Sequence, residues 1–241
     1  MVAIRQGLRA AADPAKAPAM QKYMKSPTPY LGVSAMPLRA VCKRAFAEHA
    51  LDSQRAWEAA IRELWFSATF REERYAAIEL AGASRYTAYR TLDMLPLWEE
   101  LIVSGAWWDV VDGLASHQVG ELVRKHTEPL KRTMLDWAHD ADLWKRRTAI
   151  ICQISSKNET DVELLYGAIE PNLGDTSFWI RKAIGWALRS YAWTHPDEVR
   201  RYIAEHEEQL SGLSKREALV NLSGARARAA ARRAGRLQPA P

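Results

Sequence analysis

Apolar residues recur every three to four positions along most of the chain, and this spacing predicts an almost entirely helical protein. No segment alternates apolar and polar residues as a half-buried strand would. Turn-forming residues at 26–29, 155–158, 171–175 and 195–197 separate the apolar segments, and the short loops favour antiparallel neighbours. The clearest predicted helices are 57–66, 71–83, 96–103, 161–169 and 178–191.

A small residue followed by an aliphatic one returns at nearly constant intervals of 36, 36, 34 and 35 residues. Ala40-Val41 is a candidate for an earlier unit of the same series. This period is typical of solenoids in which each helix pair buries its apolar face against its neighbours. We therefore predict an all-α helical-repeat solenoid, an α-α superhelix, as a single domain over residues 1–222. The five pairs are Ala77-Ile78, Gly113-Leu114, Ala149-Ile150, Ala183-Ile184 and Ala218-Leu219.

The central segment 105–113 is interpreted as one helix that carries Trp108 and Asp112 four residues apart, on the same face. An aromatic ring beside a carboxylate can stabilise a cation. We place the small residue of each repeat at 0° and advance ~100° around the helix axis per residue. A strip of further side chains then falls between about 160° and 300°. It contains Trp108, Asp112, Arg147, Arg181, Trp186, Arg189 and Arg216.

Such a strip would form a basic groove, with aromatic and acidic residues in it, on the concave side of the solenoid. Each residue also has a simpler interpretation. The two tryptophans could fill the core, as we expect for at least six of the ten in the chain. Asp112 could form a salt bridge with Arg147, and the arginines could be solvated. Guanidinium groups, however, suit bidentate contacts with phosphate.

Composition narrows the choice of partners and compartment. The 241 residues carry a net charge of +5 with a pI near 9.2, which is compatible with a polyanionic partner. No apolar run approaches the ~18 residues of a membrane span, so we expect neither a span nor a signal peptide and a cytoplasmic protein. Cys42 and Cys152 lie in apolar helical patterns, which predicts buried thiols rather than a disulfide or a zinc site. We expect no metal and no cofactor.

The chain ends in an Ala- and Arg-rich tail, residues 223–241. It could add attraction to DNA that is independent of sequence, or it could be a mobile, solubilising terminus. Deleting it should leave any chemical step unchanged under either interpretation.

The motif Trp107-Trp108-Asp109-Val110-Val111-Asp112, preceded by Glu99-Glu100-Leu101-Ile102-Val103, resembles the AlkD-like DNA alkylation repair family. The similarity runs from about residue 15 to about residue 222. Further segments agree in order: Tyr23-Met24-Lys25, Leu31-Gly32-Val33, Ile61-Arg62-Glu63-Leu64-Trp65, Ala183-Ile184-Gly185-Trp186-Ala187-Leu188-Arg189 and Leu213-Ser214-Lys215-Arg216-Glu217-Ala218.

The resemblance implies a HEAT-like fold and a DNA glycosylase that removes cationic N3- and N7-alkylpurines from duplex DNA without base flipping, leaving an abasic site. It implies that Trp108 and Trp186 contact the lesion-bearing deoxyribose and that Asp112 is the catalytic carboxylate. It also implies that Tyr23 lies on the lesion side and Arg147 in the groove. The expected phosphate contacts are Arg147, Arg181, Arg189, Lys215 and Arg216.

Two other functions use the same fold. A binding module would hold damaged or branched DNA in the groove without cleaving the glycosidic bond, and the intact Trp108, Asp112, Arg147 and Trp186 argue against it. A scaffold for a protein partner would not explain the row of arginines. We expect a monomer that binds double-stranded DNA, with no membrane and no obligate protein partner.

Overall fold

The computed structural model describes residues 1–220 and 222, so the predicted tail at 223–241 lies outside the described residues. All regular structure in the described part is helical, which confirms the predicted all-α class. The chain forms two compact units, Met1–Leu114 and a second that begins at Ala115. Within the described residues, no helix has the length and apolarity that crossing a membrane would require.

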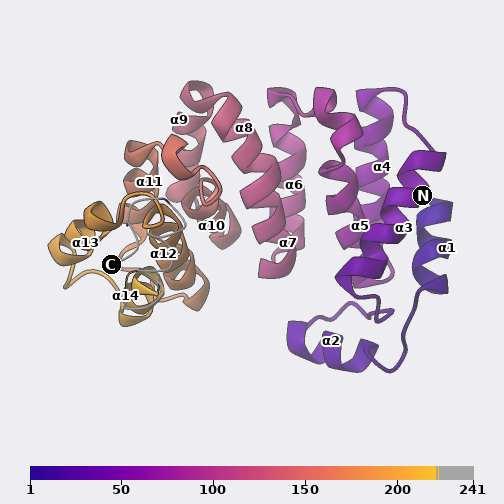
Figure 1. Ribbon diagram of the computed structural model, residues 1–241, viewed down its shortest axis with the longest axis horizontal. Helices are drawn as coiled ribbons and strands as arrows, with labels where there is room; N and C mark the ends of the chain where they lie inside the picture. Colours follow the sequence, from indigo (N-terminus) through magenta and orange to yellow (C-terminus); the bar gives the residue numbers. More distant parts are fainter. Residues whose placement is uncertain (221, 223–241) are drawn as a thin grey trace, which may run out of the picture. The chain divides into compact units, whose positions relative to one another are not determined.

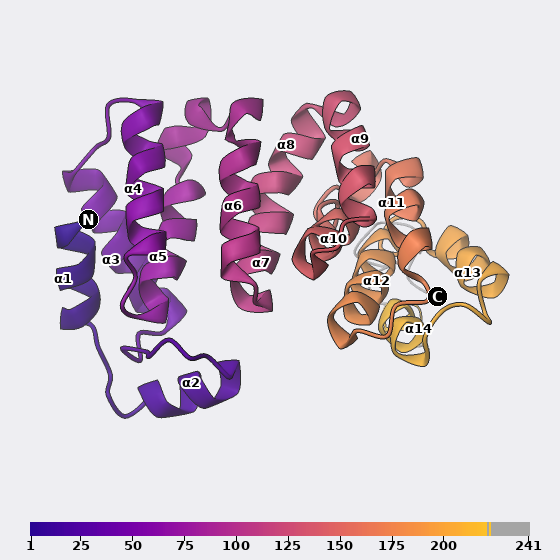
Figure 2. The same cartoon turned by 180° about the vertical axis from the view of Figure 1, so that it is seen from behind.

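In the first unit, α3, α5 and α7 are neighbours, and α4 packs against α5 (Figures 1 and 2). The short helix α2 lies outside this stack, connected to it by non-helical chain on both sides (Figure 1). The helices are α1 (Val2–Ala10), α2 (Ala17–Met24), α3 (Ala35–Glu48), α4 (Gln54–Phe66), α5 (Arg71–Ala81), α6 (Leu95–Gly105) and α7 (Trp108–Gly113).

In the second unit, α10, α12 and α14 stack in order, and α9 packs against α11. A π-helical segment, Leu114–Val119, joins α7 to α8 without a turn. The helices are α8 (Gly120–Lys125), α9 (Thr127–Ala138), α10 (Leu143–Ile151), α11 (Val162–Ile169), α12 (Phe178–Tyr191), α13 (Pro196–Glu205) and α14 (Gly212–Leu219).

The predicted repeat is confirmed by these stacks. Its five small residues lie on α5, α7, α10, α12 and α14, which are the equivalent helices of successive pairs. Small side chains let such helices approach closely. At Gly185 of α12 a Cβ atom would lie 2.8 Å from the Ser214 carbonyl oxygen and 2.4 Å from the Glu217 Cβ, so the contact with α14 requires glycine there.

Side-chain caps set the start of five helices. The N-cap residues Ser53, Asp142, Asp161, Ser177 and Ser211 each accept a hydrogen bond from a backbone N–H of the first turn. Asp161 and Ser177 lie just after the predicted breaks at 155–158 and 171–175, whereas Ser53, Asp142 and Ser211 begin helices where no break was predicted. All five clearest predicted segments are helical, with bounds that shift by a few residues.

Two expectations about packing have different outcomes. Cys42 and Cys152 are free and buried, as predicted, and burial raises the pKa of each thiol to about 12. The expectation of at least six core tryptophans is wrong, because five are buried and Trp193 is 54% exposed. The remaining four, which include Trp108 and Trp186, are half-buried. The buried five are Trp57, Trp65, Trp98, Trp137 and Trp144.

Candidate functional site

Trp108 and Asp112 occupy one short helix of the first unit. The prediction of a continuous helix over 105–113 is wrong at its start, because Ala106 takes a left-handed conformation (φ 42°) that ends α6. Trp107 is extended, so α7 begins at Trp108. Trp108 and Asp112 therefore remain one turn apart on a helix, and both are half-buried.

Tyr23 lies against Trp108 in the first unit. The two rings meet edge to face, with centroids 6.3 Å apart and an interplanar angle of 80°. Tyr23 is on α2 and is 73% exposed, so its ring is fixed on one side and open on the other. The structure thus brings together two aromatic residues that are 85 positions apart in sequence.

The segment after α2, which we call the arm root (residues 29–33), is held by Glu72. The Glu72 carboxylate is fully buried and accepts hydrogen bonds from the backbone N–H groups of Leu31, Gly32 and Val33, at 2.9–3.1 Å. Gly32 has φ 83°, and a Cβ atom there would lie 2.0 Å from the Asp13 carbonyl oxygen. Position 32 therefore requires glycine for this path.

A second carboxylate, that of Asp109, lies in the first turn of α7 beside Trp108. It accepts two hydrogen bonds from the Arg71 guanidinium, one from Nε at 3.0 Å and one from Nη2. It also accepts the Tyr75 hydroxyl at 2.5 Å. The side chains of Arg71 and Asp109 are each 4% exposed. Burial opposes the charge of Arg71, but the hydrogen bond and charge of Asp109 outweigh burial and raise the pKa of Arg71.

Sequence reasoning missed this cluster. Arg71, Glu72 and Glu73 are three consecutive charged residues that are at most 3% exposed, and charged side chains are seldom buried unless paired. Glu73 accepts hydrogen bonds from Arg5 and Thr69, both at 2.9 Å. The available signal was a run of charges at the start of a helix that otherwise follows an apolar pattern.

Arg147, on α10 of the second unit, is also buried, at 4% exposed. Its Nη1 donates to the Trp179 carbonyl oxygen at 2.6 Å, and its guanidinium lies 5.9 Å from the centre of the Trp179 ring. The Trp179 ring in turn lies 5.9 Å from that of Trp144. The phosphate contact expected of Arg147 stays a prediction.

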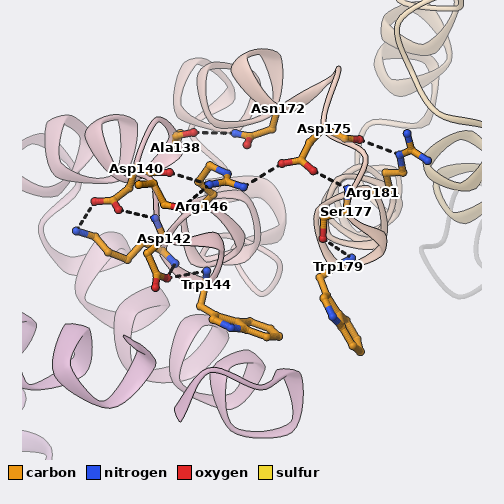
Figure 3. A network of polar contacts seen from close by, with 12 residues as sticks. Ala138, Asp140, Asp142, Trp144, Arg146, Asn172, Asp175, Ser177, Trp179 and Arg181 are labelled. Atoms are coloured by element: carbon orange, nitrogen blue, oxygen red, sulfur yellow. Dashed lines mark hydrogen bonds and ion pairs between the residues drawn. The ribbon is translucent and has the colours of Figure 1, made fainter. Parts of the chain in front are cut away.

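The loops that precede α10 and α12 are linked by a polar network (Figure 3). Arg146 donates to the Asp140 carbonyl oxygen at 2.8 Å and to the Asp175 carboxylate at 3.0 Å. Asp142 caps the first turn of α10, and Ser177 caps that of α12, so both helices begin at defined positions. Figure 3 shows Trp144 and Trp179 projecting from these two first turns, on the same side of the network.

The other predicted site residues of the second unit differ in their exposure and in their hydrogen-bond and ion-pair partners. Trp186 is half-buried on α12. Arg181 donates to the Asp175 carbonyl oxygen at 2.8 Å, and Arg189 pairs with Glu217 at 3.0 Å. Lys215 pairs with Glu207 at 2.6 Å, whereas Arg216 is exposed on α14. The roles expected of these residues toward DNA stay predictions.

The site has the chemical means to stabilise a cation. Among the described residues, no group of three or more His, Cys, Asp or Glu side chains is arranged to bind a metal ion. The first unit instead offers two aromatic rings in contact and a half-buried carboxylate one helical turn away. Rings and carboxylates both favour a positive charge that develops beside them.

Comparison with known proteins gives concordant results. The family described as DNA alkylation repair enzyme matches residues 4–222. A solved structure described as a predicted DNA alkylation repair enzyme from Enterococcus faecalis is 30% identical, with a TM-score of 0.77. The match covers 89% of this chain and 98% of that one. No curated protein matches the chain. With this fold and a family match over nearly all of its described length, the chain belongs to the family of DNA alkylation repair enzymes and has a role in DNA repair.

Proposed function

We propose that the protein is a DNA glycosylase that hydrolyses the N-glycosidic bond of cationic N3- and N7-alkylpurines in duplex DNA. The observation that carries the proposal is the contact of Tyr23 with Trp108, one helical turn from the half-buried carboxylate of Asp112. Trp186, Arg147 and the remaining basic residues of the family resemblance are also intact.

The chemistry requires few protein groups. A purine alkylated at N3 or N7 carries a positive charge, so it leaves as a neutral base when the bond electrons pass to it. The deoxyribose then develops oxocarbenium character at its anomeric carbon. Water adds to this carbon and releases a proton, which gives the abasic site. No general acid is required for departure of the base.

In this proposal Asp112 stabilises the oxocarbenium ion or orients the attacking water. A fixed carboxylate in a partly dry site favours the transition state over the ground state. The faces of Trp108 and Trp186 add electrostatic attraction on the order of 0.5–2 kcal/mol each. The edge-to-face packing of Tyr23 on Trp108 supports this role, because the contact limits rotation of the indole.

Unlike most enzymes that act on bases, the protein would leave the lesion stacked in the duplex and contact only the backbone around it. Selectivity would then depend on how readily the damaged base leaves. Basic residues of the repeat would hold the phosphates, and no cofactor would be needed. We expect a monomer in the cytoplasm, at the nucleoid when bound to DNA.

Release of free base from two defined duplexes tests the proposal. The protein should release N7-methylguanine and leave an abasic site, whereas hypoxanthine, a neutral base, should be released far more slowly. Comparable release of both bases would contradict the proposal that selectivity depends on how readily the base leaves. Binding of the methylated duplex with no release of N7-methylguanine or N3-methyladenine would favour the alternative, a non-catalytic binder of damaged or branched DNA.

A further inference from the structure

The first turn of α5 contacts both parts of the structure that carry the Tyr23–Trp108 pair. On one side, the Arg71 backbone N–H donates to the Pro29 carbonyl oxygen at 2.9 Å, and Glu72 holds the rest of the arm root. On the other side, the Arg71 guanidinium forms a bidentate pair with Asp109, the residue that follows Trp108. Arg71 therefore contacts both the arm root, which follows the helix of Tyr23, and α7, the helix of Trp108.

Tyr75, one turn further along α5, makes a second link of the same kind. Its hydroxyl donates to Asp109 Oδ2 at 2.5 Å and lies 2.7 Å from the hydroxyl of Tyr30, in the arm root. An ionised carboxylate only accepts hydrogen bonds, so the Tyr75 proton is directed to Asp109. The Tyr30 hydroxyl must then donate to Tyr75. The chain of bonds runs from Tyr30 through Tyr75 to Asp109.

Both ends of this chain of hydrogen bonds are buried, and Tyr75 between them is half-buried. Tyr30 is 5% exposed, and the side chains of Arg71 and Asp109 are 4% exposed. Water competes little with hydrogen bonds at such positions, and bonds in a chain polarise one another. Burial raises the pKa of Tyr75, and the Asp109 charge raises it further, so the phenol keeps its proton.

We propose that Arg71, Tyr75 and Tyr30 are positioning residues that act through Asp109 to fix the Tyr23–Trp108 pair for the glycosylase reaction. None of the three needs to touch the DNA. The inference rests on the proposed function for its kinetic consequence. Its structural consequence, the orientation of the Trp108 ring, does not depend on that function.

The test uses two graded variants and a matched control. Tyr75→Phe removes the central hydroxyl and breaks both bonds, whereas Tyr30→Phe removes only the outer one. Tyr166→Phe is the control, because this half-buried phenol also donates to a carboxylate, Glu198 at 3.3 Å, from a helix that carries no candidate site residue. Each protein is labelled with 5-fluorotryptophan, and the Trp108 resonance is assigned by its loss in Trp108→Phe.

Tyr75→Phe should shift or broaden the Trp108 fluorine resonance and slow single-turnover release of N7-methylguanine roughly tenfold, because misplaced groups lose much of their catalytic effect. Its affinity for the methylated duplex should change little. Tyr30→Phe should cause a smaller change in the Trp108 resonance and in the rate of release, and Tyr166→Phe should change neither quantity. An unchanged Trp108 resonance in Tyr75→Phe, or an equal loss of rate in Tyr166→Phe, would overturn the inference. If the natural chain releases no base, the proposed function fails, and the fluorine spectra alone decide whether these residues position Trp108.

Discussion

At the scale of single residues, Arg147 combines packing with a candidate contact to DNA. Its guanidinium is buried, donates to the Trp179 carbonyl oxygen and lies near the Trp179 ring. A buried group of this kind stabilises the fold through its long apolar stem as well as its hydrogen bonds. Its loss should therefore affect the folded protein before any DNA is added.

Arg147→Ala should lower the free energy of unfolding by about 1–3 kcal/mol, since it removes a buried hydrogen bond made by a charged group. Urea denaturation measures this change. Arg216→Ala is the control, because Arg216 is exposed on α14 and its loss should change stability by less than about 0.5 kcal/mol. Equal effects of the two substitutions would contradict the stabilising role of Arg147.

Sequence reasoning at this scale found residues with distinctive chemistry and missed those that support them. Trp108, Asp112 and Tyr23 are identified by their motifs, whereas Arg71 and Tyr75 resemble ordinary helical surface residues in the sequence. Their burial arises from contacts with the arm root and with Asp109, which are 34 or more positions away in sequence. Periodicity within one helix carries no information about such partners.

At the scale of elements, α2, the helix that carries Tyr23, is held by one side chain, that of Glu72, more than by packing. No residue of α2 is buried. The Glu72 carboxylate accepts hydrogen bonds from three consecutive backbone N–H groups of the arm root. Gly32 and Val33 are buried, so the loss of this acceptor would leave their N–H groups unsatisfied.

Glu72→Gln should lower the free energy of unfolding by about 2–3 kcal/mol, because the three donors lose a charged acceptor and an amide NH₂ in place of Oε2 would face the Leu31 N–H. Glu79→Gln is the control, since Glu79 forms a solvent-exposed pair with Arg39 that should contribute less than about 1 kcal/mol. Urea denaturation of both variants measures the difference. A loss in Glu72→Gln no larger than that in the control would show that packing alone holds the arm.

The contact between α12 and α14 should depend on pH through Glu217. The hydrogen bond from Lys182 lowers the pKa of this carboxyl against the effect of burial, and Arg189 lowers it further. A carboxyl with a lowered pKa in the folded state stabilises the fold above its ordinary pKa of about 4.5, and this contribution disappears as the pH falls through the folded value.

Natural protein and Glu217→Gln should therefore differ in free energy of unfolding at pH 7 by about 1 kcal/mol or less. The difference should vanish as the pH falls below 4.5 toward the folded pKa. Urea denaturation at a series of pH values measures it. A difference that does not change with pH would mean that the charge of Glu217 makes no contribution.

At the scale of the whole molecule, the repeat was the most predictable feature. A helix pair that buries small residues against its neighbours must repeat them, so the spacing is visible in sequence. The break at Ala106 was not predictable, because a left-handed alanine is a rare conformation that no local motif signals. The tryptophan count in the core was overestimated, since an aromatic residue in a helical pattern can pack against the core or line a surface.

Binding of duplex DNA should weaken steeply with salt, as expected when basic side chains displace counterions from phosphates. Arg216→Ala should reduce the slope of log affinity against log salt by roughly one. Arg132→Ala is the control, because Arg132 is an equally charged, exposed residue on α9 that pairs with Asp136. Fluorescence anisotropy at several salt concentrations measures both slopes. A salt-independent affinity, or equal slopes for the two variants, would contradict the assignment of Arg216 to the phosphate-binding row.

The most direct test of the account is single-turnover release of N7-methylguanine from a defined duplex by the natural chain and by Asp112→Asn, with DNA affinity measured for both. We predict release by the natural chain and a loss on the order of 10²-fold or more in the variant at similar affinity, since Asp112 would act in the transition state. Equal rates in the two proteins, or binding by the natural chain without any release, would contradict it.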